Sequence, residues 1–208
     1  MLTQIATTLF ALSLGYLIGS FNTAVFVGKV YGKDITSLGS KGAGLTNTLR
    51  VLGKSAAALV LVGDVLKGIV ACGIGLYLGA YATSGGVTDN VSLLAAGTGA
   101  VIGHNWPIYF GFKGGKGALT ALSVLFVLDW TIALMCLAVF AIIVVCTRLV
   151  SLGTICAALF FVAVSFVPAF GHGIYFHLFT GLIALMVVGR HKQNIQRLIA
   201  GNENRLSF

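Results

Sequence analysis

Long apolar runs alternate along the chain with short polar stretches, and the length of the runs predicts helices that cross a membrane. A crossing helix needs roughly 20 apolar residues, so the chain has room for about seven of them. The runs cover about 3–30, 54–82, 91–105 and 117–128, then Asp129 to Cys146, Arg148 to Pro168, and about 173–189. The short fourth run suggests a start inside a re-entrant region. We therefore predict an all-α polytopic membrane helix bundle in a single domain, residues 1–208.

The basic residues lie on one side of this predicted bundle. The expected outer turns, near 84–90, 128–130 and 168–173, contain no Lys or Arg. Since cytoplasmic loops carry the excess of Lys and Arg, we expect the N-terminus outside and the C-terminus in the cytoplasm. The first run has no basic residue before it, unlike a cleavable signal peptide, and is interpreted as the first crossing.

Composition narrows the class further. The chain is 58% hydrophobic and 9% charged, which excludes an ordinary soluble domain. Its net charge of +8 is typical of the positive-inside pattern rather than nucleic-acid binding, because the basic clusters border apolar segments. The four cysteines stand in apolar runs without a CxxC pair, and we expect them to be small buried hydrophobes. The tail after residue 189 predicts a basic amphipathic helix on the inner membrane surface.

The first polar segment, Gly39–Arg50, is rich in glycine and lies on the cationic side. Its glycines let the backbone approach a ligand, and a helix is expected to begin near Thr46 with its free N–H groups facing the loop. Arg50 offers a bidentate fork for a phosphate. Ser40, Thr46 and Asn47 offer neutral hydrogen bonds. A flexible solvated loop with a helix cap is the alternative interpretation.

The second polar segment contains His104 and then a glycine loop. Its residues Lys113, Gly114, Gly115, Lys116 and Gly117 precede an apolar helix, so a lysine stands where the loop feeds a helix N-terminus. This favours phosphate binding, although the P-loop spacing is absent and nucleotide binding is not predicted. A positive anchor on the inner side is the alternative.

The third polar segment is Arg190–Glu203, and a charged pair lies deeper in the membrane. On a helix, Arg190 and Asn194 share a face, and so do His191 and Asn194. A basic helix held by anionic lipid is the alternative for this segment.

Asp64 and Lys67, three residues apart within a span, are interpreted first as a structural ion pair and second as substrate contacts.

Together these motifs resemble the bacterial membrane acyl-phosphate:glycerol-3-phosphate acyltransferases over nearly the whole chain. The resemblance is carried by GS at 19–20, GS-x-G-x-G-x-TN-xx-R from Gly39, D-xx-KG from Asp64, GH-x-WP…FKGGKG from Gly103, and RH-xx-NI-x-RL-xx-G-x-E from Arg190. It implies seven helices with the motifs on the cytoplasmic side of the bacterial inner membrane. It also implies acyl transfer from acyl phosphate to the 1-hydroxyl of sn-glycerol 3-phosphate, giving lysophosphatidate and phosphate, the first step of phospholipid synthesis. No metal, nucleotide or other cofactor is implied, and an enzyme that forms acyl phosphate would act upstream.

The resemblance assigns roles at matched positions. It implies catalytic or phosphate-binding roles for Ser40 and Arg50, for Lys116 with its glycines, and for His191 and Asn194. Substrate-binding roles are expected for Thr46, Asn47, His104, Lys113, Gly114, Gly115, Gly117 and Arg190, and secondary structural roles for Asp64, Lys67 and Glu203. Either His191 or a substrate phosphate oxygen accepts the hydroxyl proton, and we favour the phosphate oxygen.

The first motif departs from the family pattern at two positions. Gly42 stands where the family usually has Asn, and Leu45 where it usually has Ala. This motivates a second hypothesis, a diverged paralogue with another acceptor or a lipid-binding role. A third hypothesis is a transporter of a phosphate-bearing anion, which would also use a cationic vestibule. It is disfavoured because the expected outer face has almost no polar groups.

Overall fold

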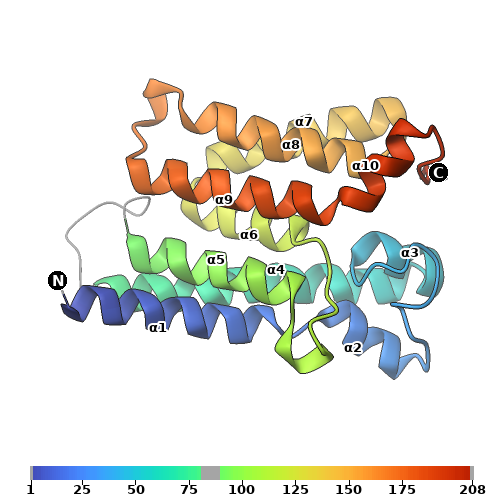
Figure 1. Ribbon diagram of the computed structural model, residues 1–208, viewed down its shortest axis with the longest axis horizontal. Coiled ribbons are helices and arrows are strands. Elements are labelled where there is room, and N and C mark those ends of the chain that lie inside the picture. Colours follow the sequence, from blue (N-terminus) through green and yellow to red (C-terminus); the bar gives the residue numbers. More distant parts are fainter. Residues whose placement is uncertain (1, 81–89, 207–208) are drawn as a thin grey trace.

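The helices of the structure follow the apolar runs closely. The computed structural model describes residues 2–80 and 90–206. Within these ranges the regular elements are all helical: α1 Leu2–Gly19, α2 Thr23–Val30, α3 Leu45–Leu52, α4 Lys54–Ala80, α5 Val91–Asn105, η2 Ile108–Phe110, α6 Ala118–Leu128, α7 Trp130–Thr147, α8 Val150–Ser165, η3 Pro168–Phe170, α9 Ile174–Arg190 and α10 Lys192–Ile199 (Figure 1). The all-α architecture predicted from the sequence is confirmed for the described residues.

Polar side chains define where several of these helices begin. The predicted first crossing, about 3–30, is interrupted after Gly19, and Asn22 accepts a hydrogen bond from the Val25 amide to start α2. Asn90 caps α5 through the Leu93 amide, and Asp129 caps α7 through the amides of residues 131 and 132. Each carboxylate or amide oxygen satisfies helix N–H groups that have no partner within the helix.

Three described stretches are long and apolar enough to cross a membrane: Leu2–Val30, Lys54–Ala80 and Trp130–Thr147. A fourth candidate combines α9 with α10, which is bent by 60° from it. The helices α6 and α8 are apolar but shorter. Large apolar side chains cover the outside of the bundle, among them Leu185 and Val145, each 72% exposed. Such a surface is typical of a protein surrounded by lipid rather than water.

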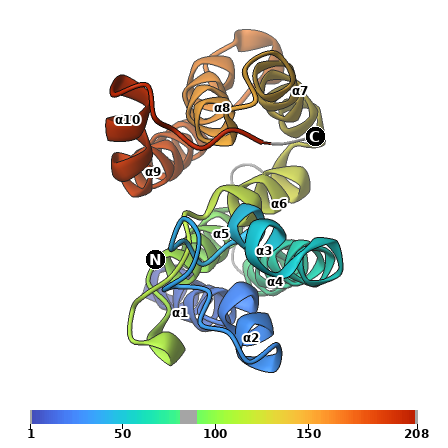
Figure 2. The same ribbon diagram turned by 90° about the vertical axis from the view of Figure 1, so that its right-hand side faces the viewer.

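Close helix packing builds one half of the molecule. Gly15 and Gly19 of α1 lie directly against the backbone of Ala96 and Ala100 in α5, where a Cβ atom would collide. Small residues at such positions let the backbones of two membrane helices approach closely. Figure 2 shows α1 to α5 grouped in one part of the molecule and α7 to α10 in the other, with α6 between them.

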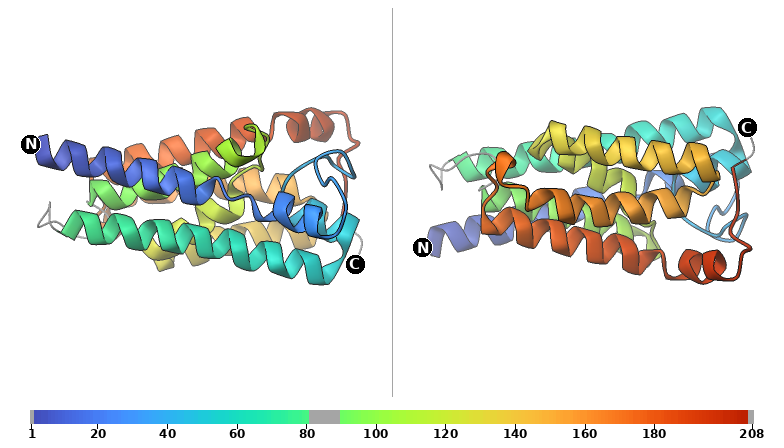
Figure 3. Two further views of the ribbon diagram at one scale, coloured as in Figure 1. Left: turned by 90° about the horizontal axis from the view of Figure 1, so that it is seen from below. Right: turned by 90° about the horizontal axis from the view of Figure 1, so that it is seen from above.

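The polar segments gather at one end of the bundle. Figure 3 shows α3, the loops around it, α10 and the C-terminal tail at this end, with the N-terminus at the opposite end. The opposite end also contains Asp129, whose carboxylate lies 3.2 Å from the His172 ring. The position of His172 in the expected outer turn favours an interfacial side chain, but the side chain is only 3% exposed and is packed against the protein. The predicted outer turn at 84–90 and residue 86 within it lie outside the described residues, apart from Asn90.

The cysteines differ from the expectation at one position. Cys72 and Cys136 are buried and Cys156 is intermediate, but Cys146 is exposed. The prediction that all four are buried was therefore wrong for Cys146. In a membrane helix the apolar residues face lipid as well as the core, so an apolar run does not by itself indicate burial.

Candidate active site

The three polar segments meet at Gly115. A Cβ atom added to this glycine would stand 2.5 Å from the Ala43 carbonyl oxygen of the first segment and would also collide with the His104 ring of the second. From the third segment, the Arg190 Nε donates a hydrogen bond of 3.0 Å to the Gly115 carbonyl. Gly115 is therefore the point at which residues far apart in the sequence are fitted together, and only a residue without a side chain fits there.

The first segment is shaped by Asn47. Its amide nitrogen donates to the carbonyls of Ile35 and Leu38, each at 3.0 Å, and its oxygen accepts from the Ser40 amide at 2.8 Å. Asn47 is buried, so these bonds hold the loop against the start of α3. The helix begins at Leu45, close to the expected start near Thr46, and no side chain caps it. In this structure Asn47 thus organises the loop, and its role toward substrate stays a prediction.

The remaining side chains of the first segment stand around this loop. Ser40 and Thr46 are half-buried, and Arg50 is exposed on α3. Gly42 is also half-buried, and a Cβ atom there would lie 3.7 Å from the Ser40 Oγ, which is ordinary contact distance. The candidate hydrogen-bond donors of this segment are therefore at least partly exposed.

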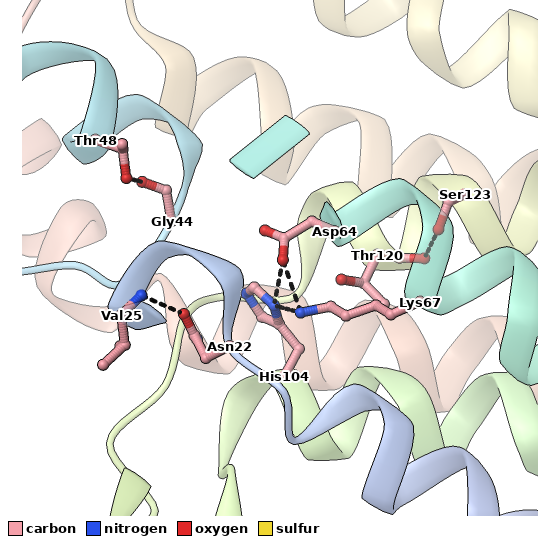
Figure 4. A network of polar contacts seen from close by, with 9 residues as sticks. All are labelled: Asn22, Val25, Gly44, Thr48, Asp64, Lys67, His104, Thr120 and Ser123. Atoms are coloured by element: carbon pink, nitrogen blue, oxygen red, sulfur yellow. Dashed lines mark hydrogen bonds and ion pairs between the residues drawn. The ribbon is translucent and has the colours of Figure 1, made fainter. Parts of the chain in front are cut away.

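A buried polar network connects the second segment to α4. The Lys67 Nζ lies 2.7 Å from the Asp64 carboxylate and 2.6 Å from the His104 Nδ1. Figure 4 shows the three side chains pointing toward one another from α4 and α5. The ammonium therefore donates to both partners, and the ion pair expected from the sequence is present. His104 is 4% exposed, so the structure places it beneath the glycine loop, and a substrate contact by it stays a prediction.

The glycine loop ends at an uncapped helix. Gly117 has a left-handed backbone with φ of +76°, which favours glycine, and α6 starts at the next residue without a side-chain cap. The first N–H groups of α6 therefore have no partner within the helix. Lys116 is half-buried beside them, whereas Lys113 is exposed and its charge lies near Asp34.

The charged groups of all three segments act on Lys116. Burial lowers the pKa of Lys116 to about 8, Glu203 opposes this shift, and the guanidinium groups of Arg197, Arg190 and Arg50 add to it. Three positive groups and one negative group therefore act on the Lys116 ammonium. The positive charge at this end of the bundle favours an anion. The residues that carry this charge come from three separate parts of the chain.

His191 is held in a defined orientation at the bend between α9 and α10. Its Nδ1 lies 2.7 Å from the Val187 carbonyl, so this nitrogen carries the proton and Nε2 keeps its lone pair. Burial lowers the pKa of His191 to about 4, although the hydrogen bond to Val187 opposes the shift. The imidazole is therefore neutral at physiological pH and offers an acceptor nitrogen.

Glu203 connects the tail to the rest of the site. Its carboxylate accepts hydrogen bonds from Asn194 at 2.7 Å, from the Arg197 Nε at 2.8 Å and from the Ser151 hydroxyl at 3.0 Å. Burial opposes ionisation, yet these three donors lower the pKa of Glu203 overall. Sequence reasoning identified Glu203 but missed Ser151, because a lone serine on an apolar helix carries no local signal.

Taken together, these observations define an integral membrane helix bundle with a cluster of cationic and polar side chains at one end. The model of the glycerol-3-phosphate acyltransferase family matches residues 9–201. The chain belongs to this family.

Known relatives agree with this assignment over most of their length. The chain is 39% identical to the glycerol-3-phosphate acyltransferase of Thermoanaerobacter pseudethanolicus over 194 residues, covering 93% of this chain and 92% of that protein. It is 43% identical to the enzyme of Shouchella clausii over 206 residues, covering 97% and 95%.

Two solved structures share the fold. The crystal structure of PlsY (YgiH), an integral membrane glycerol 3-phosphate acyltransferase, in its glycerol 3-phosphate form superposes with a TM-score of 0.87 and 35% identity, covering 96% of each chain. The lysophosphatidic acid form of the same protein gives a TM-score of 0.84, also with 35% identity, covering 96% of this chain and 95% of that one.

Proposed function

We propose that the chain transfers an acyl group from acyl phosphate to the 1-hydroxyl of sn-glycerol 3-phosphate, giving lysophosphatidate and inorganic phosphate, the first step of phospholipid synthesis. In this step the hydroxyl oxygen forms a bond to the acyl carbon, the bond from that carbon to the phosphate oxygen breaks, and phosphate leaves with its electron pair. The observation that carries the proposal is the meeting of three polar segments at Gly115, with Lys116 inside the field of Arg50, Arg190 and Arg197.

Two phosphates must be held at the site, one on each substrate. Arg50 and Lys116 are the cations proposed to bind them, and the free N–H groups at the starts of α3 and α6 add partial positive charge. Groups of this kind stabilise the charge that develops on the leaving phosphate and on the acyl oxygen. Since phosphate is a good leaving group, no covalent enzyme intermediate is needed.

A substrate phosphate oxygen is the proposed acceptor of the hydroxyl proton. A phosphate monoester has a second pKa near 6, whereas the pKa of His191 is lowered to about 4. The imidazole is therefore the weaker base of the two. His191 and Asn194 then serve to orient the acceptor, and Ser40 and Thr46 donate hydrogen bonds to the phosphates.

Seven crossings with the N-terminus outside are proposed for the topology. This puts the site on the cytoplasmic face of the bacterial inner membrane, where an enzyme that forms acyl phosphate would supply the donor. Single cysteines test it in a background without the native cysteines. Asn202→Cys should react with an impermeant thiol reagent only after the membrane is opened, and Ala169→Cys should react from outside. The reverse pattern would contradict the topology.

A diverged paralogue with another acceptor is the second candidate. It is favoured by one observation, the space beside Ser40 that Gly42 leaves where the family usually has Asn. Glycerol 3-phosphate and other phosphorylated alcohols should be compared as acceptors, with the wild type and Gly42→Asn. A larger acceptor preferred by the wild type and rejected by the variant would support this candidate over the first.

The choice of donor is tested with purified protein. Palmitoyl phosphate and palmitoyl-CoA should be offered separately with glycerol 3-phosphate. Lysophosphatidate is expected from palmitoyl phosphate only, because the cationic site is proposed to bind the leaving phosphate. Equal or faster turnover with palmitoyl-CoA would contradict the proposed donor.

A further inference from the structure

Arg190 makes its contacts with the protein backbone. Its Nε donates to the Gly115 carbonyl at 3.0 Å, and its Nη2 donates to the Gly114 carbonyl at 3.1 Å. The guanidinium carbon also lies 5.3 Å from the centre of the Trp106 ring, in cation–π range. One side chain at the end of α9 thus grips two consecutive peptide groups of the glycine loop.

Trp106 and Gly115, which contact Arg190, are themselves held by hydrogen bonds. The Tyr16 hydroxyl of α1 donates to the Trp106 carbonyl at 3.0 Å. On the other side of the loop, the Gly115 amide donates to the His104 carbonyl at 3.0 Å. Both hydrogen-bonding groups of the Gly115 backbone are therefore occupied within the protein. The Gly115 N–H is accordingly not available to a substrate phosphate.

These contacts set the direction of the peptide that follows. A carbonyl held on the Arg190 side turns the next amide, that of Lys116, toward the opposite side of the backbone. We propose that Arg190 is a positioning residue, which orients the Gly114–Gly115 peptides so that Lys116 and the start of α6 face the substrate phosphate. The inference rests on the proposed acyltransferase function and adds a role that differs from direct substrate binding.

Arginine suits this role better than lysine does. The planar guanidinium can bridge two carbonyls and stack on an aromatic ring at once, whereas an ammonium group is a point charge. The carbonyl partners are uncharged, so the positive charge of Arg190 is not cancelled and also acts on Lys116. Substitutions of Arg190 can therefore separate the effect of the guanidinium's shape from the effect of its charge.

The first test compares Arg190→Lys, which keeps the charge, with Arg190→Gln, which does not. Positioning predicts that Arg190→Lys lowers kcat about tenfold or more, with the KM of each substrate changed less than about threefold. Lys192→Gln, which removes a charge from an exposed neighbour, is the matched control and should retain wild-type rates. If Arg190→Lys keeps kcat within about twofold while Arg190→Gln raises KM, charge alone matters and the proposal is overturned.

The pH profile separates the same two roles. Because the charge of Arg190 helps to lower the pKa of Lys116, Arg190→Gln should move the alkaline limb of kcat/KM to higher pH. Arg190→Lys should leave that limb in place while its rate is reduced at every pH. A reduced rate in Arg190→Lys that recovers fully at one end of the pH range would contradict a positioning role.

A spectroscopic readout does not depend on turnover. In a Trp130→Phe background, Trp106 is the one remaining tryptophan. Arg190→Lys should change its emission and its quenching by iodide, and Lys192→Gln should not. Unchanged Trp106 emission in Arg190→Lys would overturn the proposal. If the parent protein shows no acyl transfer while the emission changes as expected, the loop contact stands and the proposed reaction is what fails.

A second variant covers the case in which Arg190→Lys does not fold. Trp106→Leu removes the stacking platform and leaves Arg190 in place. It should lower kcat by about threefold to tenfold, with KM nearly unchanged. Wild-type kcat in a folded Trp106→Leu protein would count against the proposal.

Discussion

Asn194 of α10 donates a hydrogen bond to Glu203 of the tail that follows this helix, with the Asn194 amide nitrogen 2.7 Å from a Glu203 carboxylate oxygen. The same carboxylate binds Arg197 and Ser151, so it connects α10 to α8. Asn194 is 4% exposed and is proposed to orient the acceptor. Its direction is therefore set by a residue of the tail.

Replacing Glu203 with Gln should destabilise this end of the bundle. The amide keeps the shape of the carboxylate but loses the charge-assisted bonds, each of which is worth about 1.5–3 kcal/mol. The thermal unfolding temperature in detergent should fall, and Arg205→Gln, which removes one charge from the same tail, should leave it unchanged. Since the pKa of Glu203 is lowered on folding, its contribution is present above its ordinary pKa and is lost as the pH falls through the lowered value. An unchanged unfolding temperature in Glu203→Gln would show that the carboxylate does not connect these helices.

His191 should remain neutral from pH 5 to 9, as the Nδ1–H tautomer. Burial lowers its pKa to about 4, and the Val187 carbonyl accepts the Nδ1 proton. The check is nitrogen NMR of protein labelled only in its four histidines, with His191→Gln to assign the signal. Because the pKa is lowered on folding, His191 should also make the protein less stable as the pH falls from about 6.5 toward about 4. A His191 signal that titrates near 6.5 would contradict this environment.

Loss of the Lys116 proton should cause the activity to fall at alkaline pH. Its pKa is lowered to about 8, and the protonated ammonium is the form that binds phosphate. The wild-type kcat/KM is therefore expected to fall above pH 8. Lys116→Met should lose about a hundredfold or more in kcat. Any activity retained by Lys116→Arg should lack the limb, because arginine stays charged. A limb that persists unchanged in Lys116→Arg would assign it to another group.

Gly115→Ala should displace the glycine loop. The added methyl group would meet the Ala43 carbonyl and the His104 ring, and neither is the free end of a flexible side chain. A shift of about 1 Å at a reacting group can cost about a hundredfold in rate, and we expect a loss of that order in kcat. The matched control is Gly189→Ala, where the methyl group meets no atom within 4 Å. Equal rates for the two variants would show that the three segments do not need this close contact.

Replacing one residue of the Asp64–Lys67 pair should lower the free energy of unfolding more than replacing both. Each side chain is at most 5% exposed, so Asp64→Leu or Lys67→Leu alone leaves a buried charge without its partner. The expected loss is about 3–5 kcal/mol for either single variant, whereas the double variant should recover much of it. Unfolding temperatures of the three variants measure this coupling. Losses that simply add would indicate that the two residues act independently.

Much of the fold could be predicted from the sequence, because it follows from local pattern. Apolar runs gave the positions of α4, α5 and α9 to within a few residues. The predicted half-helix near Thr46 is present as α3. The interruption after Gly19 was not predicted, because Ser20 and Phe21 do not break an apolar run.

The internal contacts of the site could not be predicted in the same way. The guanidinium of Arg190 donates to carbonyls about 75 residues away in the sequence, and no local pattern indicates such partners; its expected contact with substrate stays a prediction. Asn47 and His104 likewise hydrogen-bond within the protein, and their expected substrate contacts also stay predictions. Residue types indicate what a side chain can bind, but tertiary packing decides whether the partner is substrate or backbone. The resemblance indicated which residues cluster, and the structure adds how they are held.

Turnover by the purified protein in detergent tests the proposed acyl transfer. Palmitoyl phosphate and glycerol 3-phosphate should be supplied, and phosphate release and lysophosphatidate formation should be followed together. We predict equal amounts of both products, with activity lost in folded Arg50→Ala and Ser40→Ala proteins. Phosphate release without lysophosphatidate, or no turnover by folded wild-type protein, would contradict the proposed reaction.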